Sequence, residues 1–192
     1  METGLADSIN VNSPIEPELI EKLKAGDRVL ISGVVFTARD AAHKRLVQAI
    51  AADDKLPFNI EGQTLYYMGP SPARPGQVIG SAGPTTSGRM DAYTPPLLEA
   101  GLRAIIGKGS RSAEVKEAIK KHRSIYLVTF GGAGALLSKS IKKAEVIAYP
   151  DLAAEAVMRL EVEDFPAIVA NDIHGGDLFT RNRAIYKKAQ GR

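Results

Sequence analysis

The sequence predicts an α/β fold with a layered, largely parallel central sheet. Runs of β-branched residues alternate along the chain with segments of helical periodicity, and this alternation is typical of parallel strands joined by helices. A proline-rich middle and two late strands indicate a second sheet layer. With 192 residues, 44% of them hydrophobic and 24% charged, the chain has the composition of a globular protein. We therefore expect residues 1–192 to form a single domain.

The expected elements follow in order from the amino terminus. Residues 1–26 contain Pro14 and Pro17 and few apolar side chains, which predicts an arm ending in a short helix. The β-branched run from Arg28 to Phe36 (RVLISGVVF) predicts a strand. The apolar residues after it recur with a helical period, which predicts a helix over 38–52.

The remaining elements are predicted in the same way, strands from β-branched apolar runs and helices from apolar residues with a helical period. Ser112 is expected to cap the helix that follows it. Strand and helix again alternate along most of this part of the chain. The expected elements are strands over 64–68 and 77–82, a helix containing Leu97 and Leu98, a strand over 104–106, a helix over 112–122, a strand over 124–130, a short helix after residue 131, a strand over 144–149, a helix over 152–158, strands over 159–163 and 166–170, and a helix over 178–189.

Composition excludes several classes of protein. No cysteine is present, so the chain cannot form a disulfide, supply a thiol nucleophile or ligate an iron–sulfur cluster through its own cysteines. A net charge of only +3 and the absence of tryptophan argue against nucleic-acid binding. No apolar run approaches the ~20 residues of a membrane span, and the first residues lack the features of a secretory signal. We expect a cytoplasmic protein without a membrane partner.

Several features have an ordinary structural explanation. Three histidines are present, and no two have the i,i+4 spacing of a helical metal pair, so we expect no metal site in this chain. The sequence His174-Gly-Gly-Asp177 is typical of a tight turn, and His43 could lie on a helix surface or at a contact between subunits. The glycines over 131–134 do not complete a dinucleotide-binding pattern, because Leu137 occupies the place of the third glycine.

Candidate site residues gather where predicted strands end, because parallel strands bring their carboxyl ends and the following helix N-termini to one edge of a sheet. Three of the four ends carry a cation, and cations that converge with hydroxyl groups suit a small dianion. The residues at these ends are Thr37, Arg39 and Asp40; Thr85, Thr86, Ser87 and Arg89; Lys108 between two glycines; and Gly131, Gly132 and Gly134.

Residues 83–91 (GPTTSGRMD) are the strongest indication of a functional site in the sequence. Arg39 alone could be a solvated or ion-paired side chain, and Gly107-Lys108-Gly109 could be a simple turn. By contrast, the 83–91 segment places two threonines, a serine and an arginine between glycines at a predicted strand-to-helix junction. A structural turn rarely needs that many hydroxyl groups, so we interpret this segment as functional.

Five segments, taken together, are specific enough to indicate a protein family. They are TARDAAHKR at 37–45, YYMGP at 66–70, GPTTSGRMD at 83–91, IGKG at 106–109 and EVEDFPA at 161–167. With them the chain resembles, over nearly its whole length, the β subunit of the two-subunit class I (iron–sulfur) fumarases, which is equivalent to the C-terminal domain of the single-chain enzymes. The related L-tartrate dehydratase β subunits are less similar around 37–45, where cysteines are common, and lack the EVEDFP stretch, which favours fumarase.

The resemblance implies a hydro-lyase that reversibly hydrates fumarate to L-malate at a site shared between two subunits. In that family the α subunit holds a [4Fe–4S] cluster on three cysteines, and its open iron acts as a Lewis acid on the substrate. We expect this chain to be active only with that cluster-bearing α subunit, as a heterodimer or an α2β2 assembly, on a small dicarboxylate. The resemblance also implies a swivelling-type β/β/α domain.

The same resemblance assigns roles to individual residues. Arg39, Arg89 and Lys108 bind the substrate carboxylates, and Thr85 is the proposed base that removes the C3 proton. The supporting residues are Thr86, Ser87 and Gly88 as further donors, and Asp40 and His43, which orient Arg39.

Two other functions stay open. A sister hydro-lyase acting on L-tartrate or another 2-hydroxy diacid would use the same cationic frame, with different side chains around C3. A non-catalytic anion-binding or gating subunit would depend on Thr85 for affinity or assembly and would leave the chemical step intact without it. A nucleotide-binding module is disfavoured by the incomplete glycine pattern.

Overall fold

The computed structural model describes residues 8–189, and its strands form one sheet. The seven strands lie in the order β1-β2-β3-β4-β5-β7-β6. Their bounds are β1 (Ile9–Ser13), β2 (Arg28–Thr37), β3 (Thr64–Tyr66), β4 (Ala104–Gly107), β5 (Ile125–Val128), β6 (Ile141–Ala148) and β7 (Val157–Asn171).

The helices lie mostly between successive strands. Among residues 8–189, none of them combines the length and the apolar character that a bilayer crossing requires. The α-helices are α1 (Pro17–Lys22), α2 (Asp40–Ala51), α3 (Thr94–Glu99), α4 (Ala113–Lys121), α5 (Gly134–Leu137) and α6 (Leu178–Ala189), and the 3₁₀ helices are η1 (Ser87–Met90), η2 (Ser138–Ser140) and η3 (Pro150–Glu155).

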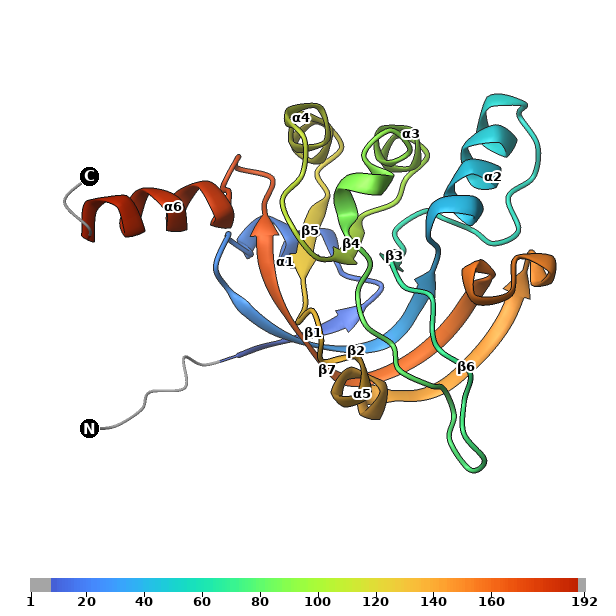
Figure 1. Cartoon of the computed structure of the whole chain (residues 1–192). Helices are drawn as coiled ribbons and strands as arrows, with labels where there is room; N and C mark the ends of the chain where they lie inside the picture. Colours follow the sequence, from blue (N-terminus) through green and yellow to red (C-terminus); the bar gives the residue numbers. More distant parts are fainter. Residues whose placement is uncertain (1–7, 190–192) are drawn as a thin grey trace.

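The sheet is mixed but largely parallel. Strands β1 to β5 pair in parallel, whereas β7 runs antiparallel to β2, β5 and β6. Because β7 pairs with both β5 and β2, the pairings close a circuit through β2, β3, β4, β5 and β7. In Figure 1, β2, β6 and β7 curve together across one side of the short strands β3, β4 and β5, while α2, α3 and α4 cover the other side.

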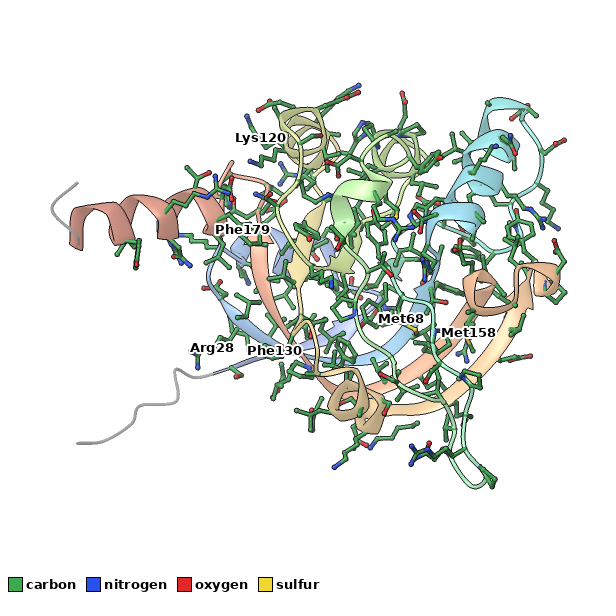
Figure 2. The ribbon with its side chains drawn as sticks, viewed as in Figure 1. Arg28, Met68, Lys120, Phe130, Met158 and Phe179 are labelled. Carbon is green, nitrogen blue, oxygen red and sulfur yellow. The ribbon has the colours of Figure 1, made fainter. Side chains whose placement is uncertain are left out.

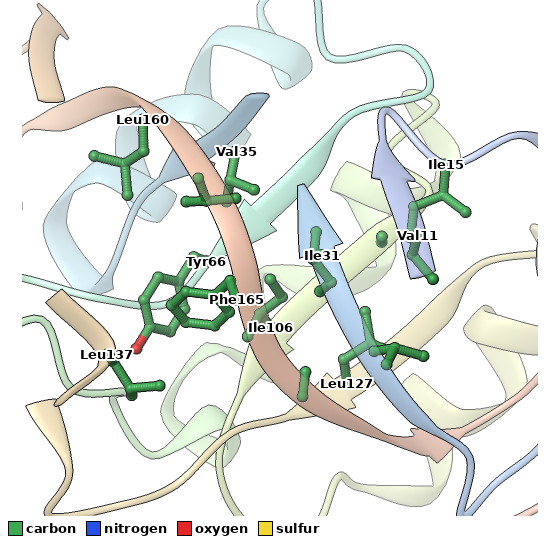
Figure 3. Close-up of a cluster of buried hydrophobic side chains, with 14 of the residues drawn as sticks. Val11, Ile15, Ile31, Val35, Tyr66, Ile106, Leu127, Leu137, Leu160 and Phe165 are labelled. Atoms are coloured by element: carbon green, nitrogen blue, oxygen red, sulfur yellow. The ribbon is translucent and has the colours of Figure 1, made fainter. Parts of the chain in front are cut away.

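The first apolar core lies inside this circuit of strands. Tyr66, Ile106 and Leu127 of the parallel strands face it, together with Ile31 of β2 and Phe165 of β7. Figure 3 shows these side chains between the two parts of the sheet, and Figure 2 shows how side chains fill the space across the molecule. The parallel strands are therefore packed on this face by the curved strands.

The second core lies between the parallel strands and the helices. Leu65, Ile105 and Tyr126 alternate with the residues of the first core, because successive side chains of a strand point to opposite faces. They pack against buried residues of the helices, including Leu46 of α2 and Leu97 of α3. Burial on both faces explains why these strands read as continuous apolar runs in the sequence.

Most predicted elements are present, including the helices over 38–52 and 178–189. The cap at Ser112 is confirmed, because its Oγ accepts a hydrogen bond from the Val115 N–H at 3.3 Å. The amino-terminal arm was incompletely predicted: its short helix is α1, but it also contains β1, which pairs with β2 from Ile9 onward. Residues 1–7 of the arm lie outside the described part of the chain.

Three elements differ from prediction. Residues 77–82 form no strand, since their hydrogen bonds run instead to Ser71 and to Gly134 of α5. The helix expected over 152–158 is the 3₁₀ helix η3, and β7 has already begun at residue 157. The two strands expected over 159–163 and 166–170 are one strand. Pro166 fits within this strand because its carbonyl accepts a hydrogen bond from Thr129 Oγ1 and so points away from β2. The N–H and C=O of a residue in an antiparallel pair point to the same side, so the N–H that proline lacks would not have bonded to β2.

Candidate active site

The predicted site residues meet at the carboxyl ends of the parallel strands. Arg39 lies two residues beyond the end of β2 and immediately precedes α2. The backbone N–H of Thr85 donates to the Tyr67 carbonyl just beyond β3, at 2.7 Å. Lys108 directly follows β4. The structure therefore brings segments that are far apart in the sequence to one edge of the sheet.

Asp40 joins the two predicted arginines. Its Oδ1 lies 2.8 Å from Arg89 Nε, and its Oδ2 lies 3.3 Å from Arg39 Nε. Partial burial opposes ionisation of Asp40, but a hydrogen bond from its own backbone and the two arginines outweigh that effect and lower its pKa. Arg89 Nη1 and Nη2 have no hydrogen-bond partner among residues 8–189 and remain available to a ligand.

Glu155 is a second partner of Arg39 that the sequence did not reveal. Its Oε1 lies 3.5 Å from Arg39 Nε, and its Oε2 accepts a hydrogen bond from the Ala41 N–H in the first turn of α2 at 2.7 Å. Glu155 belongs to η3, more than a hundred residues along the chain, so no local pattern could indicate this contact. Asp40 and Glu155 together hold the Arg39 side chain, which is 24% exposed.

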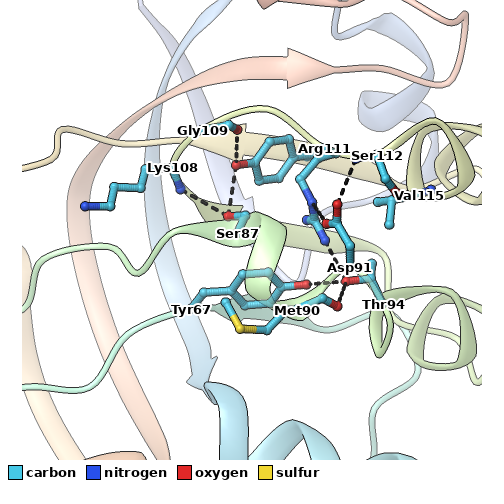
Figure 4. A network of polar contacts seen from close by, with 11 residues as sticks. Tyr67, Ser87, Met90, Asp91, Thr94, Lys108, Gly109, Arg111, Ser112 and Val115 are labelled. Atoms are coloured by element: carbon cyan, nitrogen blue, oxygen red, sulfur yellow. Dashed lines mark hydrogen bonds and ion pairs between the residues drawn. The ribbon is translucent and has the colours of Figure 1, made fainter.

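Ser87 and Lys108 bind each other across two loops. The Ser87 N–H donates to the Lys108 carbonyl at 2.9 Å, and the Lys108 N–H donates to Ser87 Oγ at 3.1 Å. Gly107 makes this approach possible, because a Cβ at that position would lie 1.9 Å from Ser87 Oγ. The Lys108 side chain instead runs past Gly131 and points away from these bonds (Figure 4). Its ammonium group makes no ion pair within residues 8–189.

The other residues of the 83–91 segment differ in exposure. Thr85 is half-buried, whereas Thr86 and Gly88 are exposed. Ser87 is buried, so its hydroxyl serves the contact between the loops rather than the open edge. Gly88 has open space where a Cβ would stand, so no steric need for glycine arises there within this chain.

His43 lies in the interior, which overturns the alternative that it sits on a helix surface. Its ring is fully buried, and Nδ1 lies 3.1 Å from the Arg39 carbonyl, which can only accept, so Nδ1 carries the proton. Burial lowers the pKa of His43 to about 4, and the positive charge of Arg111 adds to this effect. The neutral ring thus holds the backbone of Arg39 at the start of α2.

A buried network beneath the site went unpredicted. The Arg111 side chain is fully buried, its Nε lies 2.7 Å from Asp91 Oδ1, and its Nη2 donates to Thr94 Oγ1 at 2.6 Å. Its guanidinium also lies over the ring of Tyr67 (Figure 4) and over that of Tyr126. Asp91 belongs to the 83–91 segment, which the sequence already indicated as functional. Arg111 is a single arginine before a helix, and nothing in the sequence around it predicts that its side chain is buried.

The residues over 174–177 form part of a tight, hydrogen-bonded turn, as the sequence predicts. Asp172 accepts hydrogen bonds from the N–H groups of His174 and Gly176, and Asp177 accepts from the Phe179 N–H at the start of α6. Within residues 8–189, no three His, Asp or Glu side chains gather in a way that could hold a metal ion.

Comparison with known proteins shows the family of this chain. Residues 2–182 match the family model described as Fumarase C-terminus. The chain is 38% identical over 181 residues to "Fumarate hydratase class I, aerobic" of Salmonella typhimurium and 39% identical over 181 residues to "Fumarate hydratase class I, anaerobic" of Escherichia coli. Each alignment covers 92% of this chain but only 31% and 33% of the respective relative, so the chain spans about a third of their length.

A third relative is similar in size to this chain. It is a protein of Methanocaldococcus jannaschii that has been given the name L(+)-tartrate dehydratase subunit beta. The two are 35% identical over 176 residues, covering 88% of this chain and 90% of that protein. By the family match and by these relatives, the chain belongs to the Fumarase C-terminus family.

Proposed function

We propose that this chain is the β subunit of a hydro-lyase that interconverts fumarate and L-malate. The observation that carries the proposal is the Asp40 bridge, which sets the guanidinium groups of Arg39 and Arg89 side by side at an open edge of the sheet. Thr85 and Lys108 belong to the loops at the same edge. Family membership and relatives named fumarate hydratase support the choice of substrate.

Arg39, Arg89 and Lys108 bind the two carboxylates of the substrate in this proposal. Each arginine turns Nε toward Asp40, which leaves its terminal nitrogens for a bidentate contact with a carboxylate. Removal of the C3 proton places negative charge on the adjacent carboxylate as an aci-carboxylate. Fixed guanidinium donors stabilise that species more than the ground state, and loss of one such donor lowers turnover on the order of 10²–10³-fold.

Thr85 is the proposed base for the C3 proton. A free hydroxyl is too weak an acid to be ionised near pH 7, so it becomes competent only in a strongly cationic, water-poor pocket. Arg89, four residues further on, and Lys108 provide the positive charge. Thr85 is already half-buried in this chain alone, and closure by a partner subunit removes more water.

The [4Fe–4S] cluster implied by the fumarase resemblance does not fit this chain. The sequence contains no cysteine, and the described residues offer no alternative group of ligands. We therefore assign the cluster to a partner α subunit, in a heterodimer or an α2β2 assembly. The "subunit beta" in the name of the M. jannaschii relative supports a two-chain enzyme, as does the small share of the class I fumarases that this chain covers. The curved strands beneath the parallel ones support a swivelling-type β/β/α domain.

A second candidate is an L-tartrate dehydratase β subunit, favoured by one specific observation. The relative with that name matches this chain along 90% of its own length. Both reactions remove water from a 2-hydroxy diacid, so the same three cations serve either substrate. A substrate panel separates the two, because the side chains near C3 decide which substituent is accepted.

A pair of variants at position 85 tests the proposal. In the complex with the α subunit, Thr85→Val removes the hydroxyl at nearly constant shape, and we expect turnover to be lost while malate still binds by calorimetry. Thr85→Ser retains the hydroxyl and is the matched control, for which we expect measurable turnover. Wild-type rates from Thr85→Val would remove Thr85 from the chemistry and leave the gating function as the better account.

A further inference from the structure

Arg111 has no contact with the open edge of the site, yet it touches both loops that form that edge. It belongs to the loop over 107–112, which carries Lys108, and its side chain contacts Asp91 at the end of the loop over 83–91, which carries Thr85 and Arg89. Its side chain has no exposed surface. A buried guanidinium is costly unless its charge and its donors are matched, so its surroundings must compensate for that burial.

The compensation comes from one carboxylate, the Thr94 hydroxyl and two aromatic rings, while Nη1 has no hydrogen-bond partner among the described residues. Asp91 Oδ1 accepts from Arg111 Nε at 2.7 Å, and the guanidinium carbon lies 5.4 Å and 4.9 Å from the ring centres of Tyr67 and Tyr126. Burial lowers the pKa of Arg111, but Tyr67, Tyr126 and Asp91 more than reverse this, so the pKa lies above its usual value and the charge is retained. Only a planar guanidinium can stack on rings and donate in its own plane at once.

Two of the partners of Arg111, Asp91 and Tyr126, in turn join the two loops. The first branch runs through Asp91, whose Oδ2 accepts from the Ser112 N–H at 2.8 Å, so the end of the 83–91 loop is tied to the end of the 107–112 loop. The second branch runs through Tyr126, whose Oη lies 2.9 Å from Ser87 Oγ and 2.8 Å from the Gly109 carbonyl. Figure 4 shows the first branch, from Arg111 through Asp91 to Ser112.

The second branch ends on the backbone of a proposed substrate-binding residue. Ser87 Oγ accepts from the Lys108 N–H at 3.1 Å, and the Ser87 N–H donates to the Lys108 carbonyl. The position of Lys108 relative to the 83–91 loop therefore depends on Ser87, and the position of Ser87 depends on the Tyr126 ring that packs against Arg111.

We infer that Arg111 is a positioning residue of this site, which fixes the loop that carries Thr85 and Arg89 against the loop that carries Lys108. The inference rests on the proposed function for its catalytic consequence, but its structural part stands without it. Arg111→Lys keeps the charge and loses the fork and the stacking, so both branches loosen together. Misplacement of about 1 Å in such loops lowers kcat/KM about 10²-fold.

Residue-resolved hydrogen exchange on the full chain tests the structural part without any assay of activity. In Arg111→Lys we expect the amides of Ser87, Lys108 and Ser112 to exchange at least about tenfold faster, because local opening sets their rate. Amides in the β1–β2 pairing keep their wild-type rates. The control is Ile20→Ala, which removes buried apolar surface of α1 and accelerates exchange around α1 while sparing both loops.

A second variant, Tyr126→Phe, tests the inference even if Arg111→Lys destabilises the whole protein. Tyr126→Phe retains the ring against Arg111 and removes only the hydroxyl that reaches Ser87 and Gly109. We expect faster exchange at Ser87 and Lys108 and an unchanged Ser112 amide, which belongs to the other branch. Unchanged exchange at Ser87 and Lys108 in both variants overturns the inference, as does acceleration confined to Ser112.

Kinetics of the complex with the α subunit test the catalytic part, with malate as the probe. Arg111→Lys raises KM and lowers kcat, because it shifts both a binding cation and the proposed base, whereas Ile20→Ala changes neither. Normal kinetics for Arg111→Lys overturn the positioning role. A wild-type complex inactive on malate contradicts the proposed function alone, because the exchange result decides independently whether Arg111 fixes the loops.

Discussion

Acidification should destabilise this protein through one buried group, His43. Its imidazole is fully buried at the start of α2, and Nδ1–H donates to the Arg39 carbonyl. The rings of Tyr67 and Tyr93 lie nearby, and the charged groups acting on it are Arg111 and Asp40. Burial favours the neutral form most strongly, and the pKa falls from 6.5 to about 4.

The size of the effect follows from linkage. Above pH 6.5 His43 is neutral in both the folded and the unfolded chain and contributes no pH dependence. Between pH 6.5 and 4 the unfolded chain binds a proton at His43 that the folded chain does not, so the free energy of unfolding falls as the pH is lowered. The difference between 6.5 and about 4 corresponds to about 3 kcal/mol at pH 4.

Urea unfolding followed by circular dichroism at pH 7.5 and pH 4 measures this effect in the wild type and in His43→Asn. Asparagine has no proton to gain and offers an N–H where Nδ1 stands, so it serves as the matched control. Asp40 and Asp177, whose pKa values are also lowered, titrate in both proteins and cancel in the comparison. We expect the wild type to lose about 3 kcal/mol more than His43→Asn. Equal losses in the two proteins would show that His43 is not held neutral by burial.

Two further substitutions test the contacts that assemble the site. Gly107→Ala places a Cβ 1.9 Å from Ser87 Oγ, and we expect a loss of stability of about 1–3 kcal/mol in thermal unfolding, typical of overpacking; an unchanged Tm would mean that the two loops are not in close contact. Asp40→Asn removes the charge shared by Arg39 and Arg89, and we expect KM for malate to rise roughly tenfold, as for loss of a charged hydrogen bond, with stability nearly constant because the pairs are partly exposed. A normal KM would show that Asp40 does not orient them.

The fold was predictable where local sequence and tertiary structure agree. The long strand β2 and the helix α2 have strong periods of their own, and both are present. Strand β1 was missed because INVNS is short and only two of its five residues are buried. The two strands expected over 159–163 and 166–170 are one strand, in which the Pro166 carbonyl points to Thr129 and away from β2, and that direction is a tertiary property.

Some residues of the candidate site could be predicted from the sequence, and others could not. Arg39, Arg89 and Lys108 stand directly after strands or in a hydroxyl-rich loop, so their convergence follows from the rule that parallel strands end at one edge. Arg111 and Glu155 could not be found in this manner. Their partners, Tyr126 and Arg39, are distant in the sequence, and nothing in a single arginine or glutamate signals that it will be buried or paired.

The most direct test of the proposed function is an anaerobic assay of the chain mixed with the cluster-bearing α subunit of the same enzyme. Fumarate absorbance is followed with L-malate as substrate, and the product of L-tartrate dehydration is measured in parallel. We predict fumarate formation from malate that requires both chains. Dehydration of tartrate alone would retain the chemistry and change the substrate. A fully assembled, cluster-loaded complex that acts on neither acid would contradict the account.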